Sequence, residues 1–253
     1  MGEVTVLSIG TSHPWNVAGV GLDLRIGAEL GTRVLTVVAA VSAQDARGLH
    51  ALHPVPRAVV RAQLEAIPWD RVDAVRVGAL GSAEAVHAVA EAVRVPGMPV
   101  VVDPVFAATR GGEFADDTTI RAIAERLMTL PSAIVTPNIS EAGVLLGGRR
   151  IERDSLEDSA AELQTLGARA ILLKGGHLDG APVDVLAMAD AVERFEGERI
   201  EGEMRGTGCT LAMALACALG RGDEMLDAVR FARRFVREKI AHAVEFGGLH
   251  AAY

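Results

Sequence analysis

The segment Gly206-Thr207-Gly208-Cys209 combines two glycines, a hydroxyl group and a thiol immediately before an apolar run. Glycines let the backbone turn sharply and let a ligand approach its N–H groups closely. The first amides of a following helix have no partner inside that helix, and the positive end of the helix dipole lies behind them. The turn is therefore suited to bind an anion, such as a transferring phosphoryl group.

Cys209 lies where the same amides would favour a thiolate. A free thiol has a pKa near ~8.5, and a helix N-terminus lowers it. A thiolate at this point could accept the proton of an attacking hydroxyl group. The alternative is that the turn is an ordinary one and that Cys209 fills space in the core, like Cys217. The turn is not a Walker A loop, because GxxxxGK[ST] occurs nowhere in the chain.

Composition and charge exclude several classes of protein. The chain has 253 residues, of which 50% are hydrophobic but only 4% are aromatic, so its core must consist mainly of Ala, Val, Leu and Ile. The net charge of -8 argues against a general nucleic-acid binder, which needs clustered Lys and Arg. Neither a CxxC pair nor a Cys/His cluster indicates zinc.

The cysteines, the N-terminal sequence and the length of the apolar stretches bear on the cellular compartment of the protein. Cys209 and Cys217 lie about 12 Å apart along one expected helix, which excludes a disulfide between them. The N-terminal sequence lacks the basic start and apolar run of a signal peptide, and no apolar stretch reaches the length of a membrane span. We therefore expect a cytoplasmic protein without a membrane segment.

Short β-rich runs alternate with helical periodicity along the chain. Several of the runs are continuously apolar, which is typical of a parallel sheet covered on both faces. The expected strands are Val4–Ile9, Val34–Val41, Ala74–Val77, Pro99–Asp103, Ala133–Thr136 and Ala170–Lys174, with Val183–Ala189 and Glu193–Ile200 as an antiparallel pair at the sheet edge. The expected helices are Arg57–Ile67, Ala83–Val93, Thr118–Met128, Ser155–Leu166 (with a capping box of Asp154 and Glu157), Cys209–Leu219 and Asp223–Phe246. The alternation predicts one doubly wound α/β domain over residues 1–253.

Several sequence blocks occur in the order and spacing of a known family. They are Ala18-Gly19 with Gly21-Leu22-Asp23-Leu24, Ser42-Ala43-Gln44-Asp45, Arg76-Val77-Gly78-Ala79-Leu80-Gly81, Val102-Asp103-Pro104-Val105, Thr136-Pro137-Asn138 with Glu141, Lys174-Gly175-Gly176-His177, Asp184-Val185-Leu186 and Gly206-Thr207-Gly208-Cys209-Thr210. Over roughly residues 4 to 240, the chain resembles the hydroxymethylpyrimidine/phosphomethylpyrimidine kinases of thiamine biosynthesis. The resemblance implies the ribokinase-like α/β fold, with a central, mostly parallel sheet flanked by helices on both faces.

The resemblance implies roles for the residues of the turn. Cys209 resembles the general base of the family, and the amides of Gly206, Thr207 and Gly208 would hold the transferring phosphoryl group, with Thr207 also contacting ATP. Lys174 would be a point charge on the ATP phosphates, at a strand end where such folds bind ligands. Its alternative is a solvated charge at the end of a strand.

The resemblance also implies Mg²⁺, which prefers oxygen ligands and keeps several waters. Asp103, Asn138 and Glu141 match the residues that hold this metal, mostly through water, and Asn138 would also contact ATP. Asn138 could instead cap the helix that begins near Ser140, with Glu141 favourable in its first turn. Asp103 could simply end a strand.

Four further positions are implied as contacts of the acceptor substrate: Gln44, Gly10, Ala79 and Val105. The amide of Gln44 offers both a donor and an acceptor to the edge of a heteroaromatic ring. Ala79 stands where the family usually has Met, which removes side-chain volume from the pocket.

The chain departs from the family pattern near its start. The usual Asp-Ser-x-Gly-Gly-Ala-Gly wall is replaced by Ser12-His13-Pro14-Trp15-Asn16-Val17-Ala18-Gly19. Trp15 could reshape the pocket or stack on a planar ring, but both His13 and Trp15 could also serve packing alone. Arg205 replaces a common His beside the turn and could bind an anionic group or lie on the surface. His177 could be a site residue or a loop residue.

These observations favour an ATP- and Mg²⁺-dependent kinase. Its small-molecule acceptor would be the hydroxymethyl group of 4-amino-5-hydroxymethyl-2-methylpyrimidine, and the phosphate of the resulting monophosphate would be a further acceptor. A pyridoxal or pyridoxine kinase is the nearest alternative, since relatives with the same cysteine turn accept those ring alcohols. A non-catalytic sensor of pyrimidine-like ligands is the alternative from another class. The resemblance is compatible with a homodimer.

Overall fold

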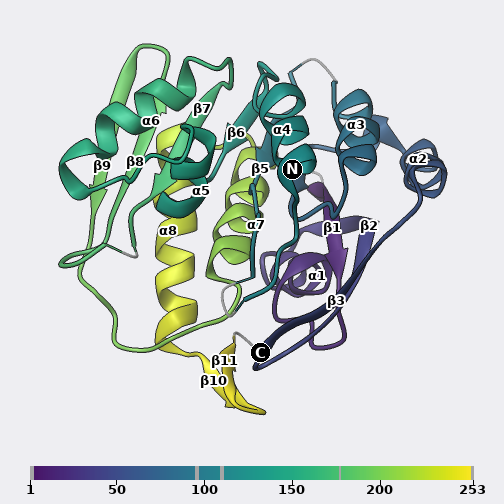
Figure 1. Ribbon diagram of the computed structural model, residues 1–253, viewed down its shortest axis with the longest axis horizontal. Coiled ribbons are helices and arrows are strands. Elements are labelled where there is room, and N and C mark those ends of the chain that lie inside the picture. The colour runs from purple at the N-terminus through teal and green to yellow at the C-terminus, as the bar shows by residue number, and fades with distance from the viewer. Residues whose placement is uncertain (1–2, 95–96, 109–110, 177, 252–253) are drawn as a thin grey trace.

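The computed structural model describes residues 3–94, 97–108, 111–176 and 178–251. Its centre is a nine-stranded sheet with the order β3-β2-β1-β4-β5-β6-β7-β8-β9 (Figure 1). The strands are β1 (Thr5–Ser12), β2 (Arg33–Asp45), β3 (Gly48–Pro54), β4 (Ala74–Val77), β5 (Val100–Val102), β6 (Ala133–Val135), β7 (Ala170–Lys174), β8 (Val183–Met188) and β9 (Ala191–Glu196). His177 lies outside the described residues.

The middle of the sheet is parallel and its edges are antiparallel. From β2 through β1 and β4 to β7, every neighbouring pair runs parallel. At one edge β3 pairs antiparallel with β2, and at the other edge β8 and β9 add two antiparallel pairings. The expected ribokinase-like α/β architecture is confirmed, including the antiparallel pair at the edge.

Helices cover both faces of this sheet because its strands are apolar on both sides. In β5, Val100 and Val102 belong to one buried cluster, with α2 to α6, and Val101 belongs to the other, with α1, α7 and α8. The helices are α1 (Gly19–Glu29), α2 (Arg57–Glu65), α3 (Ala83–Ala92), α4 (Asp117–Arg126), α5 (Ile139–Leu145), α6 (Leu156–Gln164), α7 (Thr207–Gly220) and α8 (Met225–Ala241), with short 3₁₀ turns at Trp69–Arg71 and Arg153–Ser155. As expected from its composition, α7 is buried from Thr210 to Leu219.

The expected last helix, Asp223–Phe246, is too long. Helix α8 ends at Ala241 and is followed by a hairpin of β10 (Val244–Phe246) and β11 (Leu249–Ala251). Gly247 and Gly248 form its turn with φ of +59° and +86°, values that glycine adopts readily. The apolar residues after Ala241 continue the helical pattern in the sequence, but the two glycines give the chain a tight reversal instead.

Two other local predictions are wrong. Strand β2 continues past Val41 to Asp45 and turns back into β3, a hairpin that the sequence pattern did not indicate. The capping box before α6 is formed by Glu152 and Ser155 around the preceding 3₁₀ turn, not by Asp154 and Glu157. Glu157 instead forms an ion pair with Arg194 of β9.

Candidate active site

The carboxyl ends of the parallel strands bring the predicted charged residues together with the start of α7. Lys174 ends β7, and its Nζ lies 3.0 Å from Oδ1 of Asp103, which follows β5 directly. A Cβ atom built on Gly208 would lie 3.2 Å from this Nζ and 3.7 Å from each oxygen of Asp103. The glycine turn, Lys174 and Asp103 therefore meet at one point, as the sequence predicted.

The backbone conformation at Gly206 explains why the turn needs glycine. Gly206 has a φ of +79° and precedes the first residue of α7. A Cβ at this position would lie 2.2 Å from the carbonyl oxygen of Val17. The backbone N–H and the hydroxyl of Thr210 each donate to the carbonyl of Gly206 at 2.8 Å. The turn is thus held from both sides, with the first amides of α7 beside Lys174.

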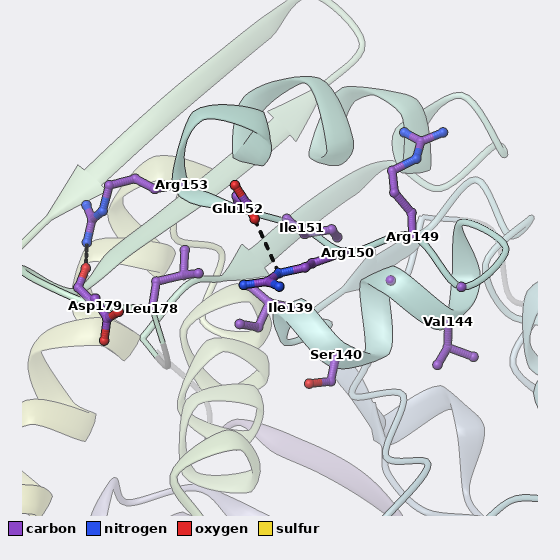
Figure 2. Close-up of a pocket in the computed structure, with 12 residues that line it drawn as sticks. Ile139, Ser140, Val144, Arg149, Arg150, Ile151, Glu152, Arg153, Leu178 and Asp179 are labelled. Carbon is purple, nitrogen blue, oxygen red and sulfur yellow. Dashed lines mark hydrogen bonds and ion pairs between the residues drawn. The ribbon is translucent and has the colours of Figure 1, made fainter.

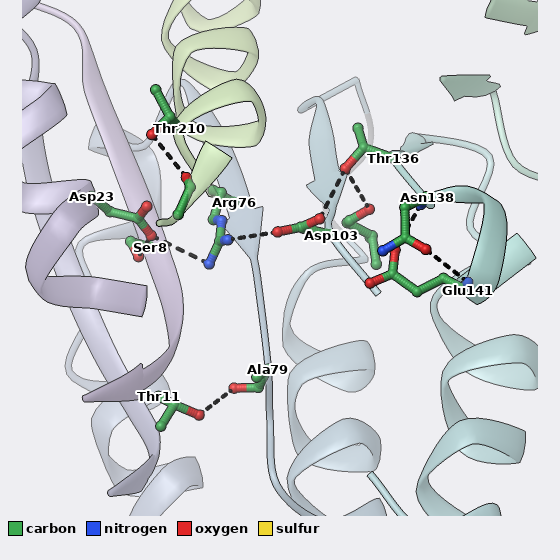
Figure 3. Close-up of polar contacts among 12 residues, drawn as sticks. Ser8, Thr11, Asp23, Arg76, Ala79, Asp103, Thr136, Asn138, Glu141 and Thr210 are labelled. Carbon is green, nitrogen blue, oxygen red and sulfur yellow. Dashed lines mark hydrogen bonds and ion pairs between the residues drawn. The ribbon is translucent and has the colours of Figure 1, made fainter. Parts of the chain in front are cut away.

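A buried arginine organises the charges beneath the turn. Arg76 of β4 is fully buried, and its two terminal nitrogens lie 3.3 Å from Oδ2 of Asp23 and 3.0 Å from Oδ2 of Asp103. Figure 3 shows the guanidinium between these two carboxylates. The hydroxyl of Ser8 donates to Asp23 at 2.6 Å. The network ties α1, β1 and β4 to the loop that carries Asp103.

Asp103 is held ionised by its two cationic neighbours. Burial alone would raise the pKa of this carboxyl, but the charges of Lys174 and Arg76 outweigh burial, and its pKa lies below the usual value. The pKa of Lys174 is correspondingly raised: burial opposes its charge, and the carboxylates of Asp103 and Glu141 more than compensate. The site therefore contains a fixed Lys174–Asp103 ion pair.

The expected low pKa of Cys209 is wrong for the ligand-free protein. Burial raises the pKa of this thiol, and the carboxylates of Asp103 and Asp23 add to the rise. The guanidinium of Arg76 and the backbone N–H of Gly19 act in the opposite direction but do not reverse it. Cys209 is therefore a protonated thiol beside a cation, and not a preformed thiolate.

Asn138 and Glu141 form the capping box of α5. The side-chain oxygen of Asn138 accepts from the backbone N–H groups of Ser140 and Glu141 at 2.9 Å, and a carboxylate oxygen of Glu141 accepts from the N–H of Asn138 at 2.7 Å. The structural role considered for these residues is therefore present. Asn138 also forms a parallel bridge with Lys174, which keeps the capping box at the site.

The chemistry of these residues also fits a magnesium ion. Burial and the nearby Asp103 carboxylate raise the pKa of Glu141 to about 7, although Lys174 opposes this. Two carboxylates that disfavour each other's charge are suited to share a hard cation, and Asn138 adds an oxygen. Within the described residues, no group of three His, Cys, Asp or Glu side chains could ligate a metal directly.

The residues predicted for the acceptor lie near the same turn. Gly10 is close to the charged network, since a Cβ there would lie 3.6 Å from Arg76 and 3.7 Å from the carbonyl oxygen of Ala79. Gln44 donates to Ser42 at 3.1 Å and accepts from Nη2 of Arg205 at 3.4 Å. Arg205 is thus half-buried beside Gln44 and not simply on the surface.

The sequence predicts that Val105 contacts the acceptor, and it leaves His13 open between the site and packing. Val105 is half-buried, and its backbone N–H donates to the carbonyl of Asp103 at 2.8 Å. His13 is only 3% exposed, and its Nε2 contacts the backbone of Ala18, which fits the packing interpretation. Burial lowers the pKa of His13, the Ala18 contact opposes this, and the charge of Arg205 adds to the lowering.

A large hollow borders α5, next to the capping box of Asn138 and Glu141. It has a volume of about 750 Å³ and is lined by α5, the 148–153 segment and Leu178 with Asp179. Figure 2 shows Arg150 paired with Glu152 and Arg153 reaching the backbone of Asp179 along its wall. None of the predicted site residues lines it. Volume alone therefore does not mark the site, whereas the convergence of charge and the glycine turn does.

The buried ion pair of Arg76 with Asp23 was not predicted from the sequence. A signal was present, because Arg76 lies within the otherwise apolar strand Ala74–Val77. A charged residue in a fully buried strand must be paired, since an unpaired buried charge costs far too much free energy. The identity of its partners could not be read from the sequence.

We predict that Arg76→Met lowers the free energy of unfolding by about 3–5 kcal/mol, because it leaves buried Asp23 and Asp103 without their shared cation. Arg76→Lys keeps the charge and should cost less. Chemical denaturation followed by circular dichroism measures both. Arg61→Met, which removes an exposed arginine of α2, is the control and should change stability by no more than about 0.5 kcal/mol. Equal stability of Arg76→Met and the parent protein would contradict the network.

The raised pKa of Glu141 predicts a pH-dependent stability in metal-free, nucleotide-free protein. Its pKa is higher in the folded state than the ordinary 4.5, so its contribution is present below pH 4.5 and is lost as pH rises through about 7. Glu141→Gln keeps an acceptor for Asn138 but cannot ionise. We expect it to gain about 1–3 kcal/mol over the parent between pH 5 and pH 8.5. Glu125→Gln, at an exposed position of α4, should show no such gain; the same pH profile for Glu141→Gln and the parent would refute the assignment.

Comparison with known proteins agrees with this geometry. A sequence model of the phosphomethylpyrimidine kinase family matches residues 14–253. The chain is 36% identical over 245 residues to the hydroxymethylpyrimidine/phosphomethylpyrimidine kinase of Streptomyces coelicolor, covering 96% of this chain and 91% of that protein. It is 39% identical over 250 residues to a thiamine biosynthesis bifunctional protein of Geobacter sulfurreducens, covering 97% of this chain but only 51%, about half, of that protein.

A similar solved structure contains a bound nucleotide analogue. The pyridoxal kinase of Staphylococcus aureus in complex with AMP-PCP and pyridoxal has a TM-score of 0.89 to this chain at 25% identity, covering 100% of this chain and 94% of that one. AMP-PCP is an analogue of ATP, which supports ATP as the phosphoryl donor of this fold. Together, the fold, the glycine turn with its lysine and these relatives establish that the chain is a phosphotransferase that belongs to the phosphomethylpyrimidine kinase family.

Proposed function

We propose that this protein transfers the γ-phosphoryl group of ATP to the hydroxymethyl group of 4-amino-5-hydroxymethyl-2-methylpyrimidine, and then phosphorylates the resulting monophosphate. The names of the matched relatives support this choice of acceptor. The observation that carries the proposal is the closeness of Lys174 to the glycine turn. Its Nζ lies 3.2 Å from the point where a Cβ atom on Gly208 would be. A lysine and the open amides of a helix start then face the same phosphoryl group.

Each residue of the site has a physical task in this reaction. The amides of Gly206, Thr207, Gly208 and Cys209 stabilise the charge on the transferring group, as preformed donors do. Lys174 supplies a positive charge to the phosphates and is kept protonated by Asp103. Its three donors suit a phosphate without fixing one geometry.

Cys209 acts as the general base of the proposed reaction. In the reacting form, its thiolate accepts the hydroxyl proton, the alkoxide oxygen forms a bond to the γ-phosphorus, and ADP leaves with the electrons of the broken bond. The guanidinium of Arg76 and the N–H of Gly19 stabilise the thiolate. Because burial and two carboxylates oppose this charge, we propose that the thiol releases its own proton to solvent, and so becomes a thiolate, only as the substrates assemble.

The metal site is proposed for Mg²⁺, held mostly through water by Asp103, Asn138 and Glu141. When bound, Mg²⁺ would neutralise phosphate charge and orient the donor. Asn138 also lies beside Lys174 and would contact ATP together with Thr207. On the other side of the turn, Gln44, Gly10, Ala79 and Val105 would contact the acceptor ring.

Pyridoxal is the second candidate acceptor. The structural similarity to the pyridoxal kinase of Staphylococcus aureus favours it, since the two chains share one fold over their whole length. The residues that contact the acceptor ring, and not those of the glycine turn, must determine which of the two alcohols is preferred. A homodimer, a cytoplasmic location and a single domain over residues 1–253 stay predictions; no described helix is long and apolar enough to cross a membrane.

We predict that Cys209→Ala lowers turnover by roughly 10²- to 10⁴-fold, the range for loss of a positioned general base. Nucleotide affinity, measured by calorimetry, should change little because Lys174 and the amides remain. Cys217→Ala is the matched control, since it removes the other thiol from the same helix at a position away from the turn. Turnover of Cys209→Ala within about threefold of the parent would remove this thiol from the mechanism.

The choice of acceptor is tested by steady-state kinetics with product masses. We expect kcat/KM for the hydroxymethylpyrimidine to exceed that for pyridoxal by about tenfold or more, because a site built to pair with ring polar groups rejects rings that leave them unpaired. The reverse order would assign the protein to the second candidate. Binding of both rings without any ATP consumption would instead indicate a sensor.

A further inference from the structure

The segment that departs from the family pattern packs against the end of the chain. Val17 is buried with Leu249 and Ala251 of β11 in a small apolar cluster that is separate from the two large ones. Trp15 and Ala46 are half-buried at its rim. Strand β11 alternates buried Leu249 and Ala251 with exposed His250, so it presents one apolar face to this cluster.

Trp15 is the main contact between the segment and the hairpin. Its ring centre lies 5.9 Å from that of Phe246 in an edge-to-face arrangement. A Cβ on Gly247 would lie 2.6 Å from the indole, so the ring lies directly on the backbone of the hairpin turn. A Cβ on Gly248 would lie 3.6 Å from Ala46, in the turn between β2 and β3. The hairpin thus spans from Trp15 to the turn that follows Gln44.

Asn16 fixes the course of this segment next to α1. It has a φ of +51°, a left-handed conformation that asparagine adopts more easily than most residues. Its side chain lies against Gly21, where an added Cβ would be 1.9 Å from Oδ1. An asparagine turn that packs on α1 therefore stands where the family pattern has glycines, and Trp15, just before it, packs on the hairpin.

The same cluster touches the backbone of the phosphoryl-binding turn. The N–H of Arg205 donates to the carbonyl of His250 at 2.8 Å, and Arg205 forms a parallel bridge with Ala251. On its other side, the carbonyl of Val17 lies against Gly206. The residues before the turn are therefore held between the hairpin and the departing segment.

We propose that Trp15 is a positioning residue of the acceptor side: through the β10–β11 hairpin and Val17, it fixes the backbone of Arg205 and Gly206. The inference rests on the proposed function. The segment leads to Gly19, whose N–H faces the Cys209 sulfur, and the hairpin holds Arg205, which contacts Gln44. Lys174 ends β7 and Asn138 caps α5, and neither residue belongs to this apolar cluster. Loss of Trp15 should therefore impair use of the acceptor more than binding of ATP.

The first test compares tryptophan variants by steady-state kinetics. Trp15→Ala should lower kcat/KM for the hydroxymethylpyrimidine by roughly 10- to 100-fold, the range for small misplacements of reacting groups, while KM for ATP stays within about twofold. Trp15→Phe keeps an aromatic edge for Phe246 and should recover most of the loss. Trp69→Ala is the matched control, because Trp69 is also half-buried but packs on one of the two large clusters and not on the small one.

A second variant removes the partner of Trp15 without a risk to folding. Phe246 is 61% exposed, so Phe246→Ala takes little apolar surface out of the core. It should impair use of the acceptor in the same direction as Trp15→Ala and leave the thermal midpoint close to that of the parent. If both variants keep the acceptor kcat/KM within about twofold, or raise KM for ATP by the same factor, the proposal is wrong.

Thiol labelling tests the positioning role without any substrate. Iodoacetamide modification is followed by mass spectrometry at Cys209 and Cys217, and the fully buried Cys217 serves as an internal reference for general unfolding. Trp15→Ala should label Cys209 several-fold faster than the parent, with Cys217 unchanged. Equal acceleration at both thiols, or none at Cys209, overturns the proposal. Because labelling needs no acceptor, it decides the question even if the parent phosphorylates no pyrimidine, a result that would refute only the proposed function.

Discussion

The placement of Arg76 between Asp23 and Asp103 is the constraint on which the site depends. A guanidinium taken out of water costs several kcal/mol unless its partners are close and well oriented, so the three groups must be buried together or not at all. They come from α1, β4 and the end of β5. Correct assembly of the parallel sheet is therefore a condition for a buried network, and the network in turn sets the position of Asp103 and, through it, Lys174.

The same network decides the charge of Cys209. The thiol lies at a helix start, which favours a thiolate, but also in a buried region that already contains two carboxylates and one guanidinium. With Arg76 shared between Asp23 and Asp103, little positive charge remains for a third anion nearby. Neutral Cys209 is then the more stable form in the empty site.

Most of the fold could be predicted because its strands and helices carry strong local signals. Continuous apolar runs such as Val100–Val102 indicated buried parallel strands, and the apolar α7 indicated a buried helix. Strand β3 gave no such signal, because only Gly48 of its seven residues is buried and the strand has no regular apolar face. In the site, the turn and Lys174 were readable as motifs, whereas the pKa of Cys209 was not, since Arg76, Asp23 and Asp103 approach it only through the tertiary fold.

The phosphoryl-binding turn tolerates few substitutions, whereas the Ser12–Gly19 segment tolerates more. Gly206 admits no side chain, and Lys174 and Asp103 fix each other, so a substitution there disturbs charge and backbone together. The Ser12–Gly19 segment has no such charges and packs on a hairpin at the chain end. A change of residue in this segment can be matched by a change in the hairpin, because both are held by apolar contact and shape. Replacement of the glycine-rich wall by Trp15 and its hairpin partner is therefore compatible with an unchanged phosphoryl-transfer apparatus.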